Sequence, residues 1–198
     1  MLVSEIDLIK TLPKIKYVIT VGELRTLFPK LGNDALMKFL KRLLKKGVLF
    51  KVKAGLYATK EASLIDISYK LNSESYLSFD SILAKYGVMG SIPRRHVAWV
   101  KVGSPKTFKF DLGIISHNSI NSKYYFGYRI VDGIKEATPE KAFIDICYFL
   151  SKGKRFSFNI SSDIAIKDLD SKLIEECLLA YPERFVEYIK KIIKDCHG

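Results

Sequence analysis

The chain has 198 residues, of which 48% are hydrophobic, and a formal net charge of +12 at pH 7. This composition supports a packed core and excludes a disordered chain, and no apolar run reaches the roughly 18 residues that a membrane-spanning helix requires. The segment Met1–Asp7 carries acidic residues and lacks the basic start of a signal peptide. We therefore expect a soluble, cytoplasmic protein that does not enter a membrane.

Residue types that support metal binding or catalysis are sparse. The three cysteines, Cys147, Cys177 and Cys196, lie far apart, so neither a disulfide framework nor a structural zinc site is expected. The sequence has no glycine-rich phosphate loop, no Gly-x-Ser-x-Gly elbow and no His-Glu-x-x-His motif. We predict no catalytic residue, no metal and no cofactor, although an active site built only in three dimensions would leave no such spacing.

The positive charge is concentrated near the N-terminus. Residues 1–60 contain 13 Lys and Arg against 4 Asp and Glu, whereas residues 61–198 contain 20 against 17. A uniform excess would reflect a general bias in composition, but a local excess indicates a local site for a polyanion.

The first elements in chain order are two short helices. The segment Ser4–Leu12 predicts a helix that ends before a proline, and Tyr17–Ile19 predicts a short extended piece. Thr20 and Glu23 have the spacing of a capping box, in which each side chain satisfies a backbone amide at the start of a helix. This second helix should end at Phe28.

A third, basic helix is predicted over Asp34–Lys46, with Asn33 as its N-cap and Gly47 closing it. One apolar stripe has helical spacing and consists of Leu36, Phe39, Leu40, Leu43 and Leu44. The remaining face is cationic and consists of Lys38, Lys41, Arg42, Lys45 and Lys46. Two helices joined by a tight turn, the second of them basic, describe a helix-turn-helix.

A hairpin with strands Val48–Val52 and Leu56–Thr59 follows, and its turn contains Gly55. Its lysines, Lys51 and Lys53, could reach backbone phosphate or a minor groove.

These elements together describe one domain. A basic helix face can also be merely solvated, but the ordered series of capping box, turn, basic helix and basic hairpin favours a winged helix-turn-helix domain over residues 1–60. The expected DNA-binding residues are Asn33, Lys38, Lys41, Arg42, Lys45, Lys46, Lys51 and Lys53, with Arg42 reading a guanine edge.

Residues 61–198 predict a second α+β domain, an antiparallel sheet with packed helices. Its expected strands are Val97–Val102, Lys106–Phe110, Gly113–His117 and Lys123–Val131. Its expected helices are Ala62–Leu71, one that ends at Gly87, one that begins after Thr138, Asp168–Ala180 and Pro182–Asp195.

Two small groups of polar residues in this domain are candidate functional sites. Arg94 and Arg95 form a basic cluster that is either a solvated loop or a contact for a nucleic acid or an acidic partner. After the cap at Thr138, Lys141 and Asp145 lie at i and i+4. A surface ion pair explains this spacing only weakly, so we expect these two side chains to serve function, with little effect on stability. We interpret His117 as a turn residue.

Three phrases of the sequence suggest a family: Gly47–Tyr57 in the hairpin, Tyr76–Gly87, and Ala137–Asp145, which is the most specific. In this order and over nearly the whole chain they resemble the AbiEi-type antitoxins, transcriptional regulators of type IV toxin–antitoxin systems. Phe143 departs from the leucine that this family often has. The resemblance implies a winged helix that autoregulates its operon at inverted repeats, and a C-terminal domain that counteracts a nucleotidyltransferase-like toxin.

Two functions of different classes therefore remain. The first is an autoregulator and antitoxin, whose partners are double-stranded operator DNA, bound as a homodimer or cooperatively, and a nucleotidyltransferase-like toxin. Under this function, Arg94, Arg95, Lys141 and Asp145 are the expected residues for the antitoxin activity. The second is a stand-alone winged-helix transcription regulator whose C-terminal domain senses a ligand or oligomerises.

Overall fold

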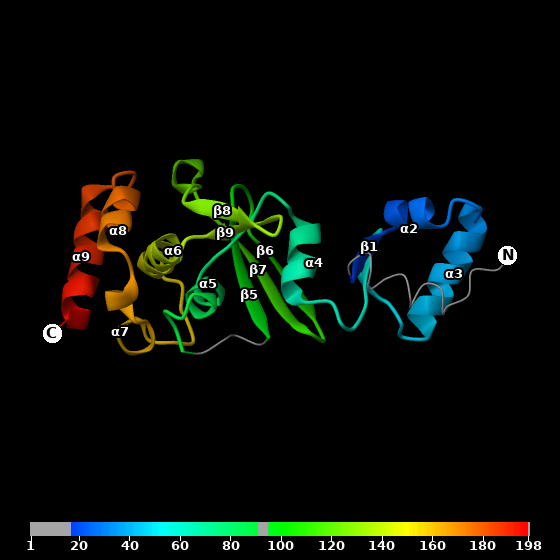
Figure 1. Ribbon diagram of the computed structural model, residues 1–198, viewed down its shortest axis with the longest axis horizontal. Helices are drawn as coiled ribbons and strands as arrows, with labels where there is room; N and C mark the ends of the chain where they lie inside the picture. The colour runs from blue at the N-terminus through cyan, green and yellow to red at the C-terminus, as the bar shows by residue number, and fades with distance from the viewer. Residues whose placement is uncertain (1–16, 91–94, 198) are drawn as a thin grey trace. The chain divides into compact units, whose positions relative to one another are not determined.

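The computed structural model describes residues 17–90 and 95–197. The chain is α+β and divides into two compact units, Met1–Leu71 and Asn72–Gly198 (Figure 1). The sequence places this boundary after residue 60. The structure places it later because helix α4 (Leu64–Leu71) packs on a strand of the first unit. The helix predicted over Ser4–Leu12 lies outside the described residues.

The described part of the first unit combines helices with a small sheet. Its elements, besides α4, are β1 (Val18–Thr20), α2 (Val21–Leu27), α3 (Asn33–Lys45), β2 (Phe50–Lys53) and β3 (Leu56–Ala58). The three strands pair antiparallel in the order β1-β3-β2. The predicted hairpin is thus joined by the extended piece that precedes α2.

The predicted capping box begins α2. The Glu23 amide donates to Thr20 Oγ1 at 3.1 Å, and the Thr20 amide donates to Glu23 Oε2 at 2.7 Å. Glu23 also pairs with Lys70 of α4, so one carboxylate connects two helices. Partial burial raises the pKa of Glu23, but the bonds from Lys70 and Thr20 outweigh it and lower that pKa below its usual value.

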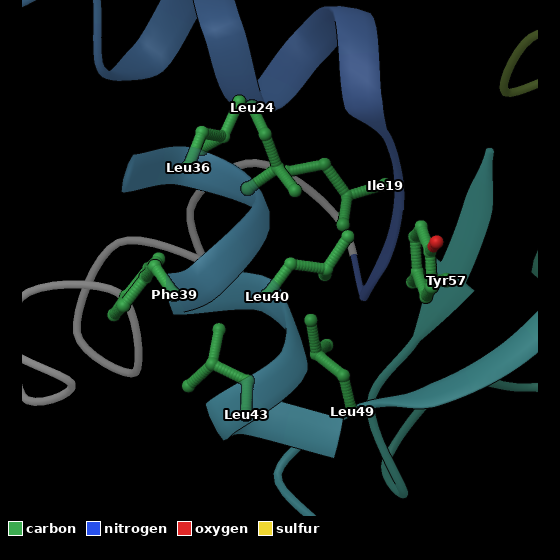
Figure 2. Close-up of a cluster of buried hydrophobic side chains, with 8 residues drawn as sticks. All are labelled: Ile19, Leu24, Leu36, Phe39, Leu40, Leu43, Leu49 and Tyr57. Carbon is green, nitrogen blue, oxygen red and sulfur yellow. The ribbon is translucent and has the colours of Figure 1, made fainter. Parts of the chain in front are cut away.

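The core of the first unit lies between α2, α3 and the sheet. Figure 2 shows side chains of α3 pointing toward Leu24 of α2 and toward Ile19 and Tyr57 of the strands. The buried side chains of α3 are four members of the predicted apolar stripe: Leu36, Phe39, Leu40 and Leu43. The helix ends where Gly47 takes φ +68°, a conformation that glycine adopts at little cost.

The second unit is built around a six-stranded sheet. Its strands are β4 (Tyr76–Leu77), β5 (His96–Lys101), β6 (Lys106–Phe110), β7 (Gly113–Ser119), β8 (Tyr128–Val131) and β9 (Ile134–Ala137). Its helices are α5 (Asp80–Lys85), α6 (Pro139–Ser151), α7 (Ile160–Asp163), α8 (Ser171–Leu178) and α9 (Glu183–His197), with 3₁₀ turns η1 (Ser122–Tyr124) and η2 (Ile166–Asp168). Helices α5 and α6 pack on the sheet, and α8 and α9 cover α6 on its other side (Figure 1).

The prediction of an antiparallel sheet was only partly right, because β4–β5, β6–β7 and β8–β9 pair antiparallel but the six-stranded sheet is mixed. The strand order is β6-β7-β5-β4-β9-β8, and β5 pairs parallel with β7 while β4 pairs parallel with β9. Each parallel pair arises because the second strand of a hairpin, β6–β7 or β8–β9, inserts beside an earlier strand. Local patterns predict hairpins, but they do not predict which hairpin strand lies next to a distant one.

The strand predicted over Lys123–Val131 was also wrong in its first half. Residues before β8 form η1 and a loop whose aromatic rings pack inward, and the Tyr124 ring stacks on Tyr181 with centroids 4.2 Å apart. Strand β9 was not predicted, and it follows β8 through Asp132 and Gly133, both at positive φ. Asp-Gly is a strong signal for a two-residue hairpin turn, so this strand had a usable local signal.

Candidate functional site

Helix α3 presents a cationic face opposite its buried leucines. With 3.6 residues per turn, Lys38, Lys41 and Lys45 fall on the side of the helix away from the core. All three are exposed, and none has a hydrogen bond or ion pair within the part of the chain that the structure describes. We call these three residues the lysine face.

The other predicted DNA-binding residues of this helix lie beside the lysine face. The Arg42 guanidinium stands over the Phe39 ring, 5.2 Å from its centroid, so this arginine flanks the face. Lys46 is exposed and forms the C-cap. The prediction that Asn33 caps α3 was wrong, because the chain enters the helix one residue earlier with Gly32 in extended backbone at the cap position.

The hairpin places its two lysines on one side. Along β2 the side chains alternate between partly buried and exposed, and Lys51 and Lys53 are the exposed members. Gly55 makes the turn at φ +77°. A bulge between Lys51 and Lys53 shifts the register against β3. Both lysines are therefore available to a ligand outside the sheet.

Acidic residues offset this charge only slightly. Between residues 17 and 71, the described part of the first unit, the sequence has eleven Lys and Arg against four acids, Glu23, Asp34, Glu61 and Asp66. Glu23 forms an ion pair with Lys70. Asp34 is the acidic side chain in the first turn of α3. The surface of the first unit is thus suited to a polyanion.

A polar network lies in the core of the second unit, between β4, α6 and the α8–α9 connection. Lys141 and Asp145 form an ion pair, and both side chains are 0% exposed. Lys141 Nζ also donates to the hydroxyls of Tyr76, at 3.1 Å, and Tyr181, at 3.4 Å. Asp145 Oδ2 accepts from the Tyr76 hydroxyl at 3.0 Å and from Ser78 Oγ at 2.8 Å.

The electrostatics of this network are those of buried, mutually satisfied groups. Burial raises the pKa of Asp145, and the bonds from Lys141, Ser78 and Tyr76 act in the opposite direction. Burial, together with the nearby Asp145 carboxylate, raises the pKa of Tyr76 and of Tyr181 well above 10. The tyrosines therefore remain neutral hydroxyl groups at physiological pH.

Lys141 and Asp145 do not form a surface pair. Both residues lie on the face of α6 that meets the sheet, and the Thr138 cap of this helix is present as predicted. The i and i+4 spacing predicts that two side chains are neighbours, but it does not predict whether they face solvent. As no solvent reaches either group, the pair lies within the core of the second unit.

The three hydroxyl partners of this pair were not predicted from the sequence. Tyr76 and Ser78 flank Leu77 in an extended segment, so period-two alternation predicts that they share one face of the sheet. That pattern was a usable signal for two buried polar groups. Tyr181 gave no comparable signal, because it belongs to the connection between two helices.

Of the predicted Arg94–Arg95 cluster, Arg94 lies outside the described residues. Arg95 is exposed, and one Nη atom donates to the Asp111 carbonyl at 2.7 Å, which fixes it to the β6–β7 turn. The prediction that His117 is a turn residue was wrong. His117 belongs to β7, is 4% exposed and contacts the Phe108 ring, and burial together with Lys101 and Lys106 lowers its pKa to about 4.

The described residues contain neither a membrane span nor a metal cluster. Within residues 17–90 and 95–197, no helix is both long and apolar enough to span a membrane. The same residues contain no group of three or more His, Cys, Asp or Glu side chains arranged to hold a metal ion.

Comparisons with known proteins show a shared fold. No protein-family model matches this sequence, and no curated protein matches it either. Among solved structures, the crystal structure of the RV2827C protein from Mycobacterium tuberculosis is similar with a TM-score of 0.65. The similarity covers 96% of this chain and 75% of that one at 14% sequence identity. The fold of this chain is thus similar to that of an experimental structure.

Proposed function

We propose that the first unit is a winged helix-turn-helix that binds double-stranded operator DNA. In this proposal α2 and α3 form the helix-turn-helix, α3 enters the major groove, and the β2–β3 hairpin is the wing. The major groove of B-DNA is wide enough to admit one α-helix. A helix that buries one side against its own unit and leaves the opposite side exposed suits this mode of binding.

The observation that carries the proposal is the unpaired lysine face of α3. Three exposed lysines without an acidic partner among the described residues repel one another, and phosphates would relieve that repulsion. Lysine binds phosphate as a point charge, whereas the planar fork of Arg42 could pair with both acceptors of a guanine. Lys51 and Lys53 would add contacts to the sugar–phosphate backbone.

We further propose that the chain is the autoregulator and antitoxin of an operon whose toxin is nucleotidyltransferase-like. The resemblance of three sequence phrases to the AbiEi-type antitoxins supports this part. The Ala137–Asp145 phrase contains buried scaffold residues, so the surface that acts on the toxin would lie elsewhere in the second unit. Arg95, which is exposed and fixed by Asp111, remains the candidate for that surface.

Binding of the full chain to the promoter DNA of its own operon tests the first part. Fluorescence anisotropy should show a preference for this DNA over a shuffled duplex. Replacement of Lys38, Lys41 and Lys45 by alanine should weaken binding by at least about tenfold at roughly 0.15 M salt. The matched control replaces Lys190, Lys191 and Lys194 of α9 by alanine. These lysines are also exposed, and their replacement removes the same charge. Equal losses of affinity in both variants would show that binding depends on net charge and not on the lysine face.

Co-expression with the nucleotidyltransferase-like protein of the same operon tests the second part. The proposal expects the full chain to restore growth, and expects rescue to persist in the variant of the lysine face when expression is driven from an unrelated promoter. A chain that binds its promoter but never rescues growth would instead be a stand-alone regulator. Arg95→Ala should reduce rescue without reducing DNA binding.

A further inference from the structure

Beside the lysine face, α3 exposes two uncharged side chains larger than alanine that the overall charge does not explain. Asn33 is exposed and does not cap the helix. Its side-chain amide has no hydrogen bond within the described residues. Met37 is 40% exposed and is the large apolar side chain that α3 turns to solvent. Neither side chain belongs to the hydrophobic core of this unit, so both are available to a ligand.

Asn33 and Met37 lie in one row. They lie four positions apart, and Lys41 lies four positions further along, so the three side chains stand above one another on the helix. Four residues of α-helix rise about 6 Å, and stacked base pairs of B-DNA are spaced roughly 3.4 Å apart. Two neighbours in this row therefore span about two base pairs.

The chemistry of this row matches an A·T-containing sequence. The Asn33 amide can accept from adenine N6 through Oδ1 and donate to N7 through Nδ2, the paired contact that asparagine makes in the major groove. The Met37 methyl and thioether can pack on the thymine C5-methyl group, which is the apolar feature of that groove. A phosphate contact requires neither an amide nor an apolar side chain.

We infer that Asn33 and Met37 read an adenine and a thymine at adjacent or next-nearest base pairs of the operator. The inference rests on the proposed function and adds to it which bases the helix selects. Met37 is the specificity determinant for the methyl group, and Asn33 is the determinant for adenine. Lys38 and Lys41 hold the helix against phosphates without selecting a base.

The test removes single groups from the DNA and from the protein. A sequence selected by the full chain from random duplexes is prepared with each thymine in turn replaced by deoxyuridine, which lacks only the methyl group. At one position this should weaken binding by about fourfold, the loss expected for one buried methyl group. Met37→Ala should bind both duplexes equally, whereas Met37→Leu should retain the preference.

The adenine contact has a parallel test. Replacing one adenine by 7-deazaadenine removes the N7 acceptor and should weaken binding by the full chain, up to the roughly 5- to 150-fold that a complete bidentate contact contributes. Asn33→Ala should be insensitive to this change. Lys38→Ala is the matched control, because it should weaken binding to every duplex by the same factor. Both variants lie at exposed positions and should fold normally.

The outcomes separate this inference from the proposed function. If the full chain selects no sequence, the proposed function fails and the inference fails with it. If a sequence is selected and bound, but no deoxyuridine effect is suppressed by Met37→Ala, DNA binding stands and the reading by Met37 is overturned. A 7-deazaadenine effect that persists unchanged in Asn33→Ala overturns the reading by Asn33.

Discussion

Gly127 packs directly against the aliphatic stem of Lys141. It has φ +72°, and a Cβ atom added to it would lie 2.9 Å from Lys141 Cγ and 3.1 Å from Cβ. The glycine thus closes the loop side of the buried network, and its carbonyl accepts from the Thr138 amide at 3.0 Å. Only a residue without a side chain fits here, since the lysine stem is itself enclosed.

The first prediction concerns this packing of glycine on lysine. Gly127→Ala should lower the free energy of unfolding by more than the roughly 1–2 kcal/mol that a left-handed backbone conformation costs alanine, because the lysine stem must also move. Gly133→Ala is the control: its φ is +80°, but no atom lies within 4 Å of an added Cβ. Urea denaturation should give Gly127→Ala a lower free energy of unfolding than Gly133→Ala. Equal losses of this free energy in the two variants would show that the packing against Lys141 is unimportant.

The second prediction concerns the buried ion pair. Asp145→Asn or Lys141→Met should each lower the free energy of unfolding by about 3–5 kcal/mol, because each leaves the partner charge buried and uncompensated. The two changes combined should lose less stability than the sum of the single changes. Strictly additive losses in this double-mutant cycle would contradict the coupling. Any loss of toxin rescue in these variants should follow the loss of stability.

A third prediction addresses the cap of α6. Thr138 Oγ1 accepts from the Lys141 amide at 3.2 Å. Thr138→Ala should therefore lower the free energy of unfolding by about 1 kcal/mol, while Thr138→Ser should change it little. Thermal melts of both variants beside the unaltered protein are the measurement. A serine variant as unstable as the alanine variant would assign the effect to the missing methyl group instead of the cap.

The fourth prediction is a dependence of stability on pH. His117 has a pKa of about 4 in the folded chain, below the value of about 6.5 in an unfolded chain. The unfolded state therefore binds more protons between these values, so the contribution of neutral His117 is complete above about pH 6.5 and is lost as the pH falls toward about 4. That loss should be about 3 kcal/mol.

The carboxylates of the protein also titrate in this range, so the comparison needs a control. His117→Gln cannot gain a proton, and its free energy of unfolding should fall less between about pH 7 and pH 4 than that of the unaltered protein. Denaturation at several pH values measures both curves. Parallel curves would show that His117 titrates normally and that its burial has no consequence for proton binding.

The fifth prediction concerns the wing. If Lys51 and Lys53 neutralise phosphates, replacing both by alanine should flatten the plot of log affinity against log salt by roughly 0.9 for each phosphate that is no longer neutralised. The preference between operator and shuffled DNA should stay the same. Lys109→Ala with Lys172→Ala, two exposed positions of the second unit, controls for net charge. An unchanged slope in the wing variant would place the hairpin away from DNA.

Local chemistry explains which parts of the structure were predictable. Four predicted features depend on residues within a few positions of one another. They are the Thr20–Glu23 capping box, the apolar stripe of α3, the hairpin turn at Gly55 and the Thr138 cap. Such motifs form from backbone hydrogen bonds and helical periodicity, which act before any distant segment arrives. The lysine face could be predicted from the sequence for the same reason, because burying one side of a helix exposes the opposite side.

By itself, then, the sequence determined the order of most elements, the localisation of positive charge and the cationic side of α3, because all of these follow from neighbouring residues. The tertiary structure alone decided that β7 and β9 lie parallel to earlier strands, and that Lys141 and Asp145 face the sheet and not solvent. Those outcomes depend on which distant surfaces meet. An ion pair at i and i+4 is the same in sequence whether water or Tyr76 and Tyr181 surround it, and only the packing of β4 and the α8–α9 connection excludes the water.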